Sequence, residues 1–242
     1  MKNLGMTKIS ISMISIMLIS QACSENKSNK MVVECTDKLS TEIIIQPQWA
    51  TETKQRLDGR KDLNYYLETK DKNYSLNSEG EKYDYKSEGF SDDEALFLTN
   101  LLVKVNKSII LNFNQKQRSE ADFLITKTCI PNESTYGIVQ MSWDGSEYIM
   151  ALNDCNSMFA DKPEAAILHE LGHVIGLEHP FDDSDGDCYQ STDSFSNNAA
   201  TMSQTLMAYK GAENAPEFYT ELDLKAISEI YGKNNTNLES LN

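Results

Sequence analysis

The apolar residues of this chain first recur at helical spacing just after residue 90. Ser91 is followed by three acidic residues, and Ser91 and Glu94 have the spacing of a capping box, in which each side chain bonds to the other residue's backbone amide. The residues that follow give a helix over about 92–107 one apolar face: Leu96, Leu98, Leu101, Leu102 and Val105. Such a face has to be covered by another layer of structure.

Two more helices are predicted further along. Asp161 is the expected N-cap of the first, with Glu164 completing a capping box and Pro163 in the first turn, where a missing amide is tolerated. We expect this helix to stop at Gly176, because glycine readily takes the left-handed conformation with which many helices end. The last helix is predicted over about 221–231, directly before a glycine.

Between these helices, short apolar runs are typical of strands. They lie at residues 109–113, 121–128, 138–143 and 148–152, and an Asp-Gly pair between the last two favours a tight turn. Residues 51–90 are far more polar, although the alternation in 63–67 also fits a strand. Helices packed on a small sheet make an α+β or mixed α/β fold the expected class.

The composition is that of an acidic globular protein. Asp and Glu number 37 against 22 Lys and Arg, which gives a net charge of −15 over 242 residues. Such a surface repels phosphate groups, so we expect no nucleic-acid partner and no general affinity for membrane surfaces. No apolar run reaches the roughly 20 residues that a membrane-spanning helix needs.

The first residues have the pattern of an export signal. Lysines precede the apolar run 9–19, and small residues come before Cys23. This pattern predicts a signal peptide over 1–22, cut after Ala22. The same stretch resembles a bacterial lipoprotein signal, so Cys23 is the candidate for lipidation. We expect an exported protein, either an outer-membrane or cell-surface lipoprotein or a freely secreted one, that contacts a membrane only through this lipid.

Five cysteines are an odd number for an exported chain. With lipid on Cys23, four remain for two disulfides, and the sequence does not choose among the three pairings: Cys35, Cys129, Cys155 and Cys188. Cys155 and Cys188 bracket the second helix and are our candidate pair. Their bond would close a loop of about 34 residues and stabilise the fold by about 3–4 kcal/mol.

The second helix carries the residues with the clearest chemistry. They have the spacing H-E-x-x-H-x-x-G-x-x-H, with His169, His173 and His179 as the histidines. Residues four apart lie on one face of a helix, so the first two histidines can bind one metal ion, and Gly176 lets the chain turn so that the third returns to it. Glu170 lies near the metal but is angled away from it, where it can hold a water molecule and take its proton.

Three histidine ligands with a fourth position open to water are typical of a catalytic zinc site. A solvated amphipathic helix would also place glutamate and histidine on one face. However, the chain has only three histidines, and all of them occupy the ligand positions. The spacing therefore predicts bound Zn²⁺.

With this extended motif, the chain resembles the metzincin zinc endopeptidases, and among them the serralysin-like and matrixin-like catalytic domains. Metzincins have a Met-turn beneath the zinc, which Met207 matches, and some have a tyrosine two residues later, which Tyr209 matches. The resemblance covers roughly residues 90–232. It implies a zincin fold: a small, twisted, mainly parallel sheet with a backing helix, an active-site helix and a C-terminal helix.

The resemblance also implies an activity, hydrolysis of peptide bonds in a protein or peptide substrate. Glu170 would activate the zinc-bound water, and Tyr209 would hydrogen-bond the oxyanion and serve as an optional zinc ligand. Gly176 and Met207 would be structural residues of the site. The substrate would lie extended along an edge strand around 148–151. The alternative is a surface zinc-binding lipoprotein that binds a protein partner without cleaving it, against which the intact general base argues.

The acidic loop after the third histidine has two interpretations. Asp183, Asp185 and Asp187 offer oxygen ligands around a turn, as Ca²⁺ sites do. The same residue types are also frequent in plain solvated loops, which is the interpretation we favour. The sequence has none of the Gly/Asp-rich calcium-binding repeats that serralysins carry.

These observations predict the organisation of the chain. After the signal peptide, residues 23–40 form a polar tether. The role of residues 41–90 is open: a propeptide, a spacer or the first strands of the catalytic domain. The resemblance assigns residues 91–232 to a zinc metallopeptidase domain, and residues 233–242 form a polar tail.

Overall fold

The structure is a computed structural model of the chain, and it describes residues 39–78, 81–129, 136–142, 144–155, 161–182, 190 and 199–233. The signal peptide, Cys23, Cys35, Cys188 and the acidic residues at 183–187 lie outside this set, so what we expect of them stays a prediction. Within the set, no helix is long and apolar enough to cross a membrane.

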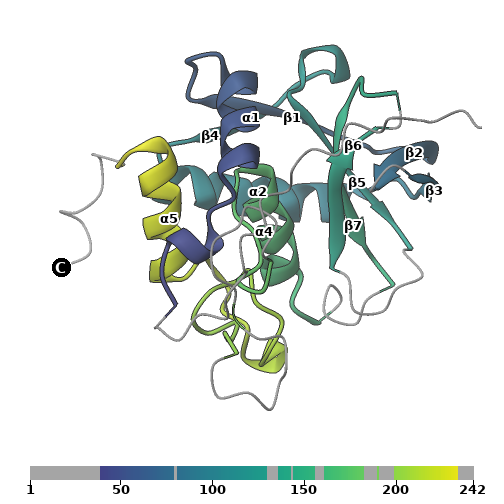
Figure 1. Cartoon of the computed structure of the whole chain (residues 1–242). Coiled ribbons are helices and arrows are strands. Elements are labelled where there is room, and N and C mark those ends of the chain that lie inside the picture. Colours follow the sequence, from purple (N-terminus) through teal and green to yellow (C-terminus); the bar gives the residue numbers. More distant parts are fainter. Residues whose placement is uncertain are drawn as a thin grey trace, which may run out of the picture. The chain divides into compact units, whose positions relative to one another are not determined.

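A five-stranded sheet forms the centre of the described fold (Figure 1). Its strands lie in the order β4 (Asn112–Gln115), β1 (Asp62–Leu67), β5 (Phe123–Thr128), β7 (Tyr148–Asn153) and β6 (Gly137–Met141). The first four run parallel, and β6 at the edge is antiparallel to β7. A separate hairpin consists of β2 (Lys72–Ser78) and β3 (Glu81–Ser87). The mainly parallel sheet confirms the expected mixed α/β class.

Helices and short 3₁₀ turns surround this sheet in the described part of the chain. The helices are α1 (Pro47–Leu57), α2 (Asp92–Ser108), α4 (Pro163–Val174) and α5 (Glu221–Tyr231). The 3₁₀ turns are η1 (Glu42–Ile44), η2 (Arg118–Glu120) and η3 (Ala212–Asn214). The backing helix, the active-site helix and the C-terminal helix expected from the sequence correspond to α2, α4 and α5.

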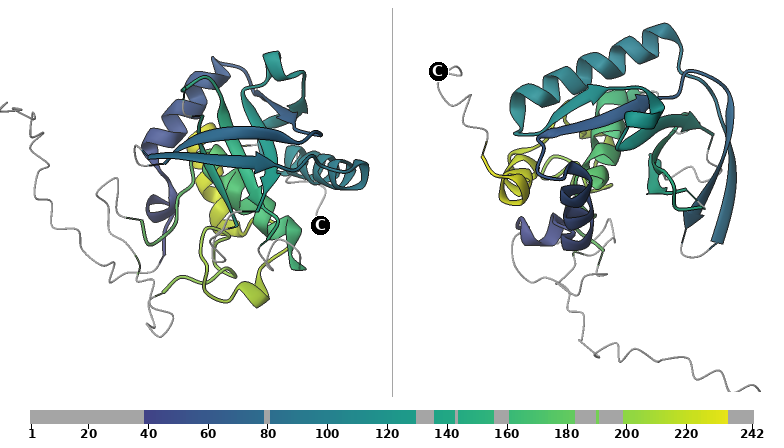
Figure 2. Two further views of the ribbon diagram at one scale, coloured as in Figure 1. Left: turned by 90° about the vertical axis from the view of Figure 1, so that its right-hand side faces the viewer. Right: turned by 90° about the horizontal axis from the view of Figure 1, so that it is seen from above.

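The two faces of the sheet pack against different elements. Phe123 and Ile125 of β5 point to one face, where they share a single apolar core with residues of all four helices. Leu124, between them in the sequence, points to the opposite face. There it packs with Tyr74 and Leu76 of the hairpin, which lies over this part of the sheet in Figure 2. The hairpin therefore covers one face of the sheet at this point, and the helices, α4 among them, pack on the opposite face.

The capping chemistry of α2 and α5 agrees with their sequences. The Glu94 amide donates to Ser91 Oγ (3.3 Å), and the Ser91 amide donates to the Glu94 carboxylate (2.8 Å), so the predicted capping box is present. Thr220 and Asp223 form an equivalent box at the start of α5. Helix α5 ends before Gly232, as predicted.

Two local predictions are wrong. Helix α4 begins after Lys162, whose side chain makes no capping bond, and Asp161 is not its N-cap, although a proline does take the first turn. Strand β4 lies a few residues beyond the expected 109–113, because the apolar Ile109 is buried as the C-cap of α2 and not as part of the sheet. Burial in a helix–strand connection and burial in a strand give the same apolar pattern.

The polar segment 41–90 belongs to the described fold. It supplies α1, the hairpin and β1, which lies between β4 and β5 in the sheet. Its first part contacts the end of α4: the Gln46 amide donates to the Gly176 carbonyl (2.9 Å), and the Thr53 hydroxyl donates to the Val174 carbonyl (2.7 Å). Segment 41–90 therefore contributes both a helix and strands to the described fold.

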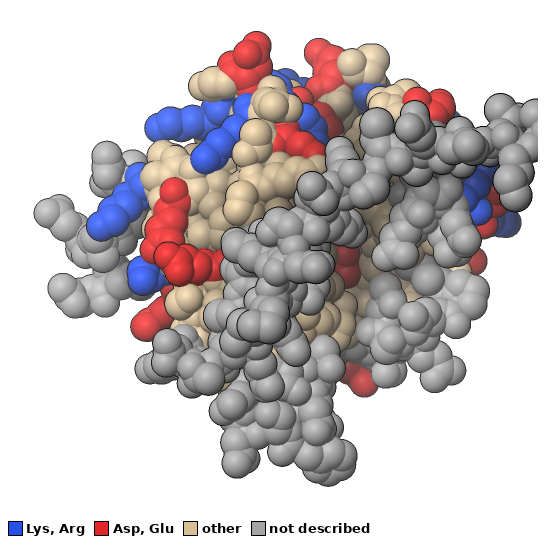
Figure 3. All heavy atoms as spheres, viewed as in Figure 1, with Lys and Arg blue, Asp and Glu red and all other residues tan. Residues whose placement is uncertain are grey.

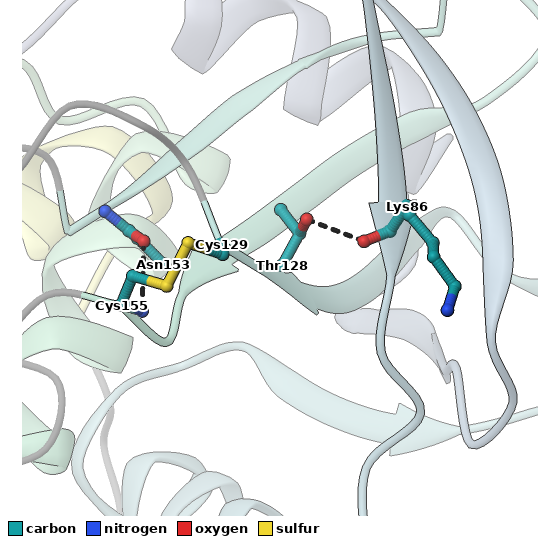
Figure 4. The surroundings of a disulfide bond; sticks show 5 residues. All are labelled: Lys86, Thr128, Cys129, Asn153 and Cys155. Carbon is teal, nitrogen blue, oxygen red and sulfur yellow. Dashed lines mark hydrogen bonds between the residues drawn. A yellow bond between two sulfur atoms is a disulfide. The ribbon is translucent and has the colours of Figure 1, made fainter.

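A disulfide joins the ends of two neighbouring strands (Figure 4). Cys129 follows β5 and Cys155 follows β7, and these strands are in register as far as Thr128 and Asn153. Because the strands are parallel neighbours, the residues just beyond their ends meet at one edge of the sheet. The expected bond between Cys155 and Cys188 is therefore wrong: the structure pairs Cys155 with Cys129.

Candidate metal centre

Helix α4 and the loop after it bring the three histidines together. His169 and His173 lie one turn apart on the same helix, both buried, and His179 returns to them after the helix has ended. One ring nitrogen from each lies within 4.8 Å of those from the other two. His169 Nε2 and His179 Nε2 are 3.2 Å apart. The structure thus gathers the residues that the sequence predicts as metal ligands.

Backbone carbonyls fix which nitrogen of each helical histidine faces the centre. His169 Nδ1 lies 2.6 Å from the carbonyl oxygen of Leu206, and His173 Nδ1 lies 2.9 Å from that of Leu177. A carbonyl oxygen can only accept, so each Nδ1 carries the proton and donates it. Each Nε2 is left with a free lone pair, which is the state that a metal ligand requires.

Burial keeps these imidazoles neutral. It lowers the pKa of His169 to about 3 and the pKa of His173 to about 4, and it holds the pKa of His179 well below its ordinary value. One ring nitrogen of each imidazole lies at the centre, where a shared cation would satisfy all three. The donor set of three neutral nitrogens is one that zinc takes, so the residues present fit this metal.

The turn that leads to the third histidine requires a glycine. Gly176 has a φ of 95°, a conformation that residues with a side chain rarely adopt. In addition, a Cβ at this position would lie 2.6 Å from Ala50 Cα in α1. Both the backbone and the surroundings of Gly176 therefore disfavour a side chain at this position, and α1 packs directly against this turn.

Glu170 lies buried beside the histidines, with 2% of its surface exposed. Burial raises the pKa of its carboxyl to about 8, and a cation bound by the histidines would favour the charged form. Gly137, the first residue of β6, lies against it: a Cβ on Gly137 would be 2.9 Å from the carboxyl carbon of Glu170. The absence of a side chain at Gly137 lets this carboxyl approach the backbone of the edge strand.

Tyr209 lies at the same cluster. Its hydroxyl is 2.9 Å from His179 Nε2, and its ring stacks on His169 with 5.3 Å between centroids. The Tyr209 ring also packs against the rings of Tyr136 and Phe181, with centroid distances of 5.2 Å and 5.5 Å. Tyr209 keeps 36% of its surface exposed, so this residue is not closed off from solvent.

The turn around Met207 supports the helix from beneath. Met207 is fully buried, and its amide donates to Thr205 Oγ1 (3.1 Å). The residue before it, Leu206, supplies the carbonyl that accepts from His169. Asp223 at the start of α5 holds this turn, because its buried carboxyl accepts from the Leu206 amide (3.1 Å) and from the Thr205 hydroxyl. The orientation of His169 therefore depends on the Met207 turn, which Asp223 of α5 holds in place.

A cleft of about 690 Å³ passes the centre. Glu170 and Tyr209 line it, together with residues 137–141 of β6. This corrects the expected substrate strand: residues 148–151 belong to β7, whose two edges pair with β5 and β6. Among the described strands of the sheet, β6 is the outermost one on the side that borders the cleft.

Several residues of this region carry no prediction from the sequence: Trp49, Tyr136, Gly137, Phe181 and Asp223. The aromatic rings meet the histidines only through tertiary contacts, for which local spacing gives no signal. Asp223 did have a signal, because Thr220 and Asp223 have capping-box spacing. That spacing explains the helix start but not the bond to Leu206.

Comparison with known proteins gives partial likenesses. No protein-family model matches the chain. The serralysin of Photorhabdus laumondii subsp. laumondii is 32% identical over an alignment of 80 residues, which covers 28% of this chain and 16% of that protein. A solved structure of myroilysin aligns with 72% of this chain and 93% of its own, at 13% identity and a TM-score of 0.41. Because the match spans only 16% of the serralysin, the activity of this chain is a matter for proposal.

Proposed function

We propose that the chain is a zinc-dependent endopeptidase of the metzincin type. One observation carries the proposal: three histidine nitrogens within 4.8 Å of one another, beside a buried glutamate, in a cleft bordered by an edge strand. The partial sequence likeness to a serralysin supports the same function.

His169, His173 and His179 would hold the Zn²⁺ ion through their unprotonated nitrogens. Zinc bound there would polarise a carbonyl group and lower the pKa of water. Three protein ligands leave a position for substrate, whereas structural zinc sites close with a fourth protein ligand.

Glu170 is the proposed general base. It takes a proton from the attacking water and passes it to the nitrogen that leaves the scissile peptide bond. The backbone of β6 pairs with the substrate as a further strand. Because Gly137 brings this backbone against the Glu170 carboxyl, a peptide paired with β6 presents its scissile bond next to the base.

Tyr209 is the proposed donor to the oxygen that becomes negative during the attack. Its hydroxyl lies at the histidine cluster, and stacking on His169 restricts its ring. A donor of this kind can stabilise a transition state by about 3 kcal/mol.

We also propose that the protein is exported, with residues 1–22 as the signal and Cys23 as the lipid attachment site, and that it acts on proteins or peptides. Since α1 and β1 belong to the fold that carries the histidines, we place the start of the catalytic domain near residue 41 and its end near 232.

The test is cleavage of an unstructured protein by the zinc-loaded chain after removal of the signal. Glu170→Gln should abolish cleavage without loss of zinc. Glu164→Gln makes the same chemical change in the first turn of the same helix and should cleave like the wild type. A chelator should stop cleavage, and added zinc should restore it.

Cleavage by Glu170→Gln at the wild-type rate would remove Glu170 from the mechanism. Zinc bound at one ion per chain, without cleavage by any variant, would favour the alternative of a zinc-binding surface protein that holds a partner without cutting it.

A further inference from the structure

Helix α1 forms part of the cleft that contains the metal centre. Trp49 and Glu52 lie three residues apart, hence on one face of the helix, and both line the cleft. The Trp49 ring meets His173 edge to face, with 5.5 Å between centroids. Both side chains are only partly buried, so each keeps a surface open to an incoming peptide.

The charged groups in the lining are of one sign. Among the described residues, the carboxylates of Glu52 and Asp182 line the cleft together with the buried carboxyl of Glu170, and no Lys or Arg lines it. The outer surface differs, since acidic and basic side chains are interspersed on the face shown in Figure 3. A cleft lined by one sign of charge concentrates ligands of the opposite sign.

The carboxylate of Glu52 is available for a ligand. It accepts one hydrogen bond from Gln48 Nε2 (2.9 Å) and forms no ion pair within the described residues. Arg56, one turn further on, lies over the ring of Tyr148 at 3.9 Å and is not part of the lining. An aromatic surface beside an unneutralised carboxylate is a suitable arrangement for a long cationic side chain.

The direction of β6 determines which residues of a bound peptide would lie near Trp49 and Glu52. This strand runs from Gly137, next to the proposed base, to Met141, which pairs with Tyr148 of β7. A peptide that pairs antiparallel with β6 enters at the Met141 end and reaches Glu170 later in its own sequence. Residues before the scissile bond then lie in the part of the cleft that Tyr148 lines.

We infer that this cleft selects substrates with a Lys or Arg residue on the N-terminal side of the scissile bond, held by the carboxylate of Glu52 and the ring of Trp49. The inference rests on the proposed peptidase function and names the substrate class of the same site.

The test uses a set of flexible peptides that differ at one position, which holds Lys, Gln or Glu and is moved along the sequence. We expect kcat/KM for the best Lys peptide to exceed that of its Gln counterpart by about tenfold at low salt, and the ratio to shrink at about 0.5 M salt. Mass spectrometry of the products should place the lysine before the cut.

Variants then assign the preference to Glu52. Glu52→Gln should bring the Lys-to-Gln ratio close to one, and Glu52→Lys should reverse it in favour of the Glu peptide. Glu42→Gln is the matched control, because Glu42 is exposed in the short turn before α1 and does not line the cleft. It should keep the wild-type ratio.

The outcomes separate the two proposals. If the wild type cuts all three peptides equally, or if Glu52→Gln keeps the lysine preference, this inference is overturned while the peptidase function stands. If the wild type cuts no peptide and no unstructured protein, the proposed function fails first.

Discussion

The sulfur of Met207 lies 2.6 Å from the position that a Cβ on Gly172 would occupy. Gly172 lies in the middle of α4, and the buried Met207 fills the space that a side chain at this position would need. This contact joins the Met207 turn to the residue next to His173.

Gly172→Ala should destabilise the fold by about 1–3 kcal/mol, although alanine is the better helix former, because its methyl group overlaps the Met207 sulfur. The shift should also weaken zinc binding. Urea unfolding with and without a chelator measures both effects. In Gly172→Ala/Met207→Ala, the overlap disappears, so the loss should be smaller than the sum of the single losses. An additive result would show that the two residues are not in contact.

Gly176→Ala should be more damaging than Gly145→Ala. Both glycines have positive φ, at 95° and 71°, and alanine at either costs about 1–2 kcal/mol for that reason. Only at Gly176 would the added methyl group also meet the backbone of Ala50, whereas nothing lies within 4 Å of it at Gly145. The difference in unfolding free energy between the two variants isolates the packing of α1 on the turn, and equal losses would contradict that packing.

Asp223→Asn should lower both stability and zinc affinity. The amide nitrogen replaces either the oxygen that accepts from Thr205 or the one that accepts from Leu206, so at least one buried hydrogen bond is lost, at about 1–3 kcal/mol. The Leu206 carbonyl then loses its fixed position, and His169 its orientation. Competition with a colorimetric chelator gives the zinc affinity. Wild-type affinity in a folded Asp223→Asn protein would mean that Leu206 stays in place without Asp223.

The exposed Asp144, in the turn between β6 and β7, should make the fold sensitive to acid. Hydrogen bonds from Ser142 and Ser146 lower the pKa of its carboxyl to about 2, from an ordinary value of 3.8. The stabilisation of the folded state by the Asp144 carboxylate is present above pH 3.8 and is lost as the pH falls towards 2. In chelated protein, Asp144→Asn should therefore lose less stability over this window than the wild type does. An identical loss would exclude Asp144 as its source.

Removal of the Cys129–Cys155 bond should destabilise the protein by about 2–4 kcal/mol, since it closes a loop in the unfolded chain. The variant Cys129→Ala/Cys155→Ala tests this by denaturant unfolding. Peptide mapping under non-reducing conditions tests the pairing directly. Recovery of Cys155 joined to Cys188 would restore the pairing first expected from the sequence.

The sequence predicts the elements whose local signals agree with one another. At α2, a capping box and an apolar stripe indicate the same helix, and the structure contains both. The histidine spacing likewise needs only the geometry of one helix and one turn, which is why the cluster at His169, His173 and His179 could be anticipated.

What the sequence misses depends on contacts made at a distance. Helix α1 buries only Ala50, Thr53 and Leu57 in eleven residues, so its pattern is too polar to stand out. The disulfide depends on β5 and β7 being neighbours in the sheet, which follows from strand order and not from spacing. The edge position of β6 has the same cause, since sequential runs do not show which strand is outermost.

The bond from His169 to the Leu206 carbonyl has a consequence for the order in which the protein matures. The residue that supplies this carbonyl, Leu206, is held through its own amide by Asp223, in the last helix of the described fold. On a growing chain, His169 emerges long before its orienting partner is fixed. Full affinity for zinc, and with it the proposed activity, would then arise only after α5 has been made and has packed against the Met207 turn. With the proposed activity, such a delay would limit cleavage of other proteins while the chain is being made.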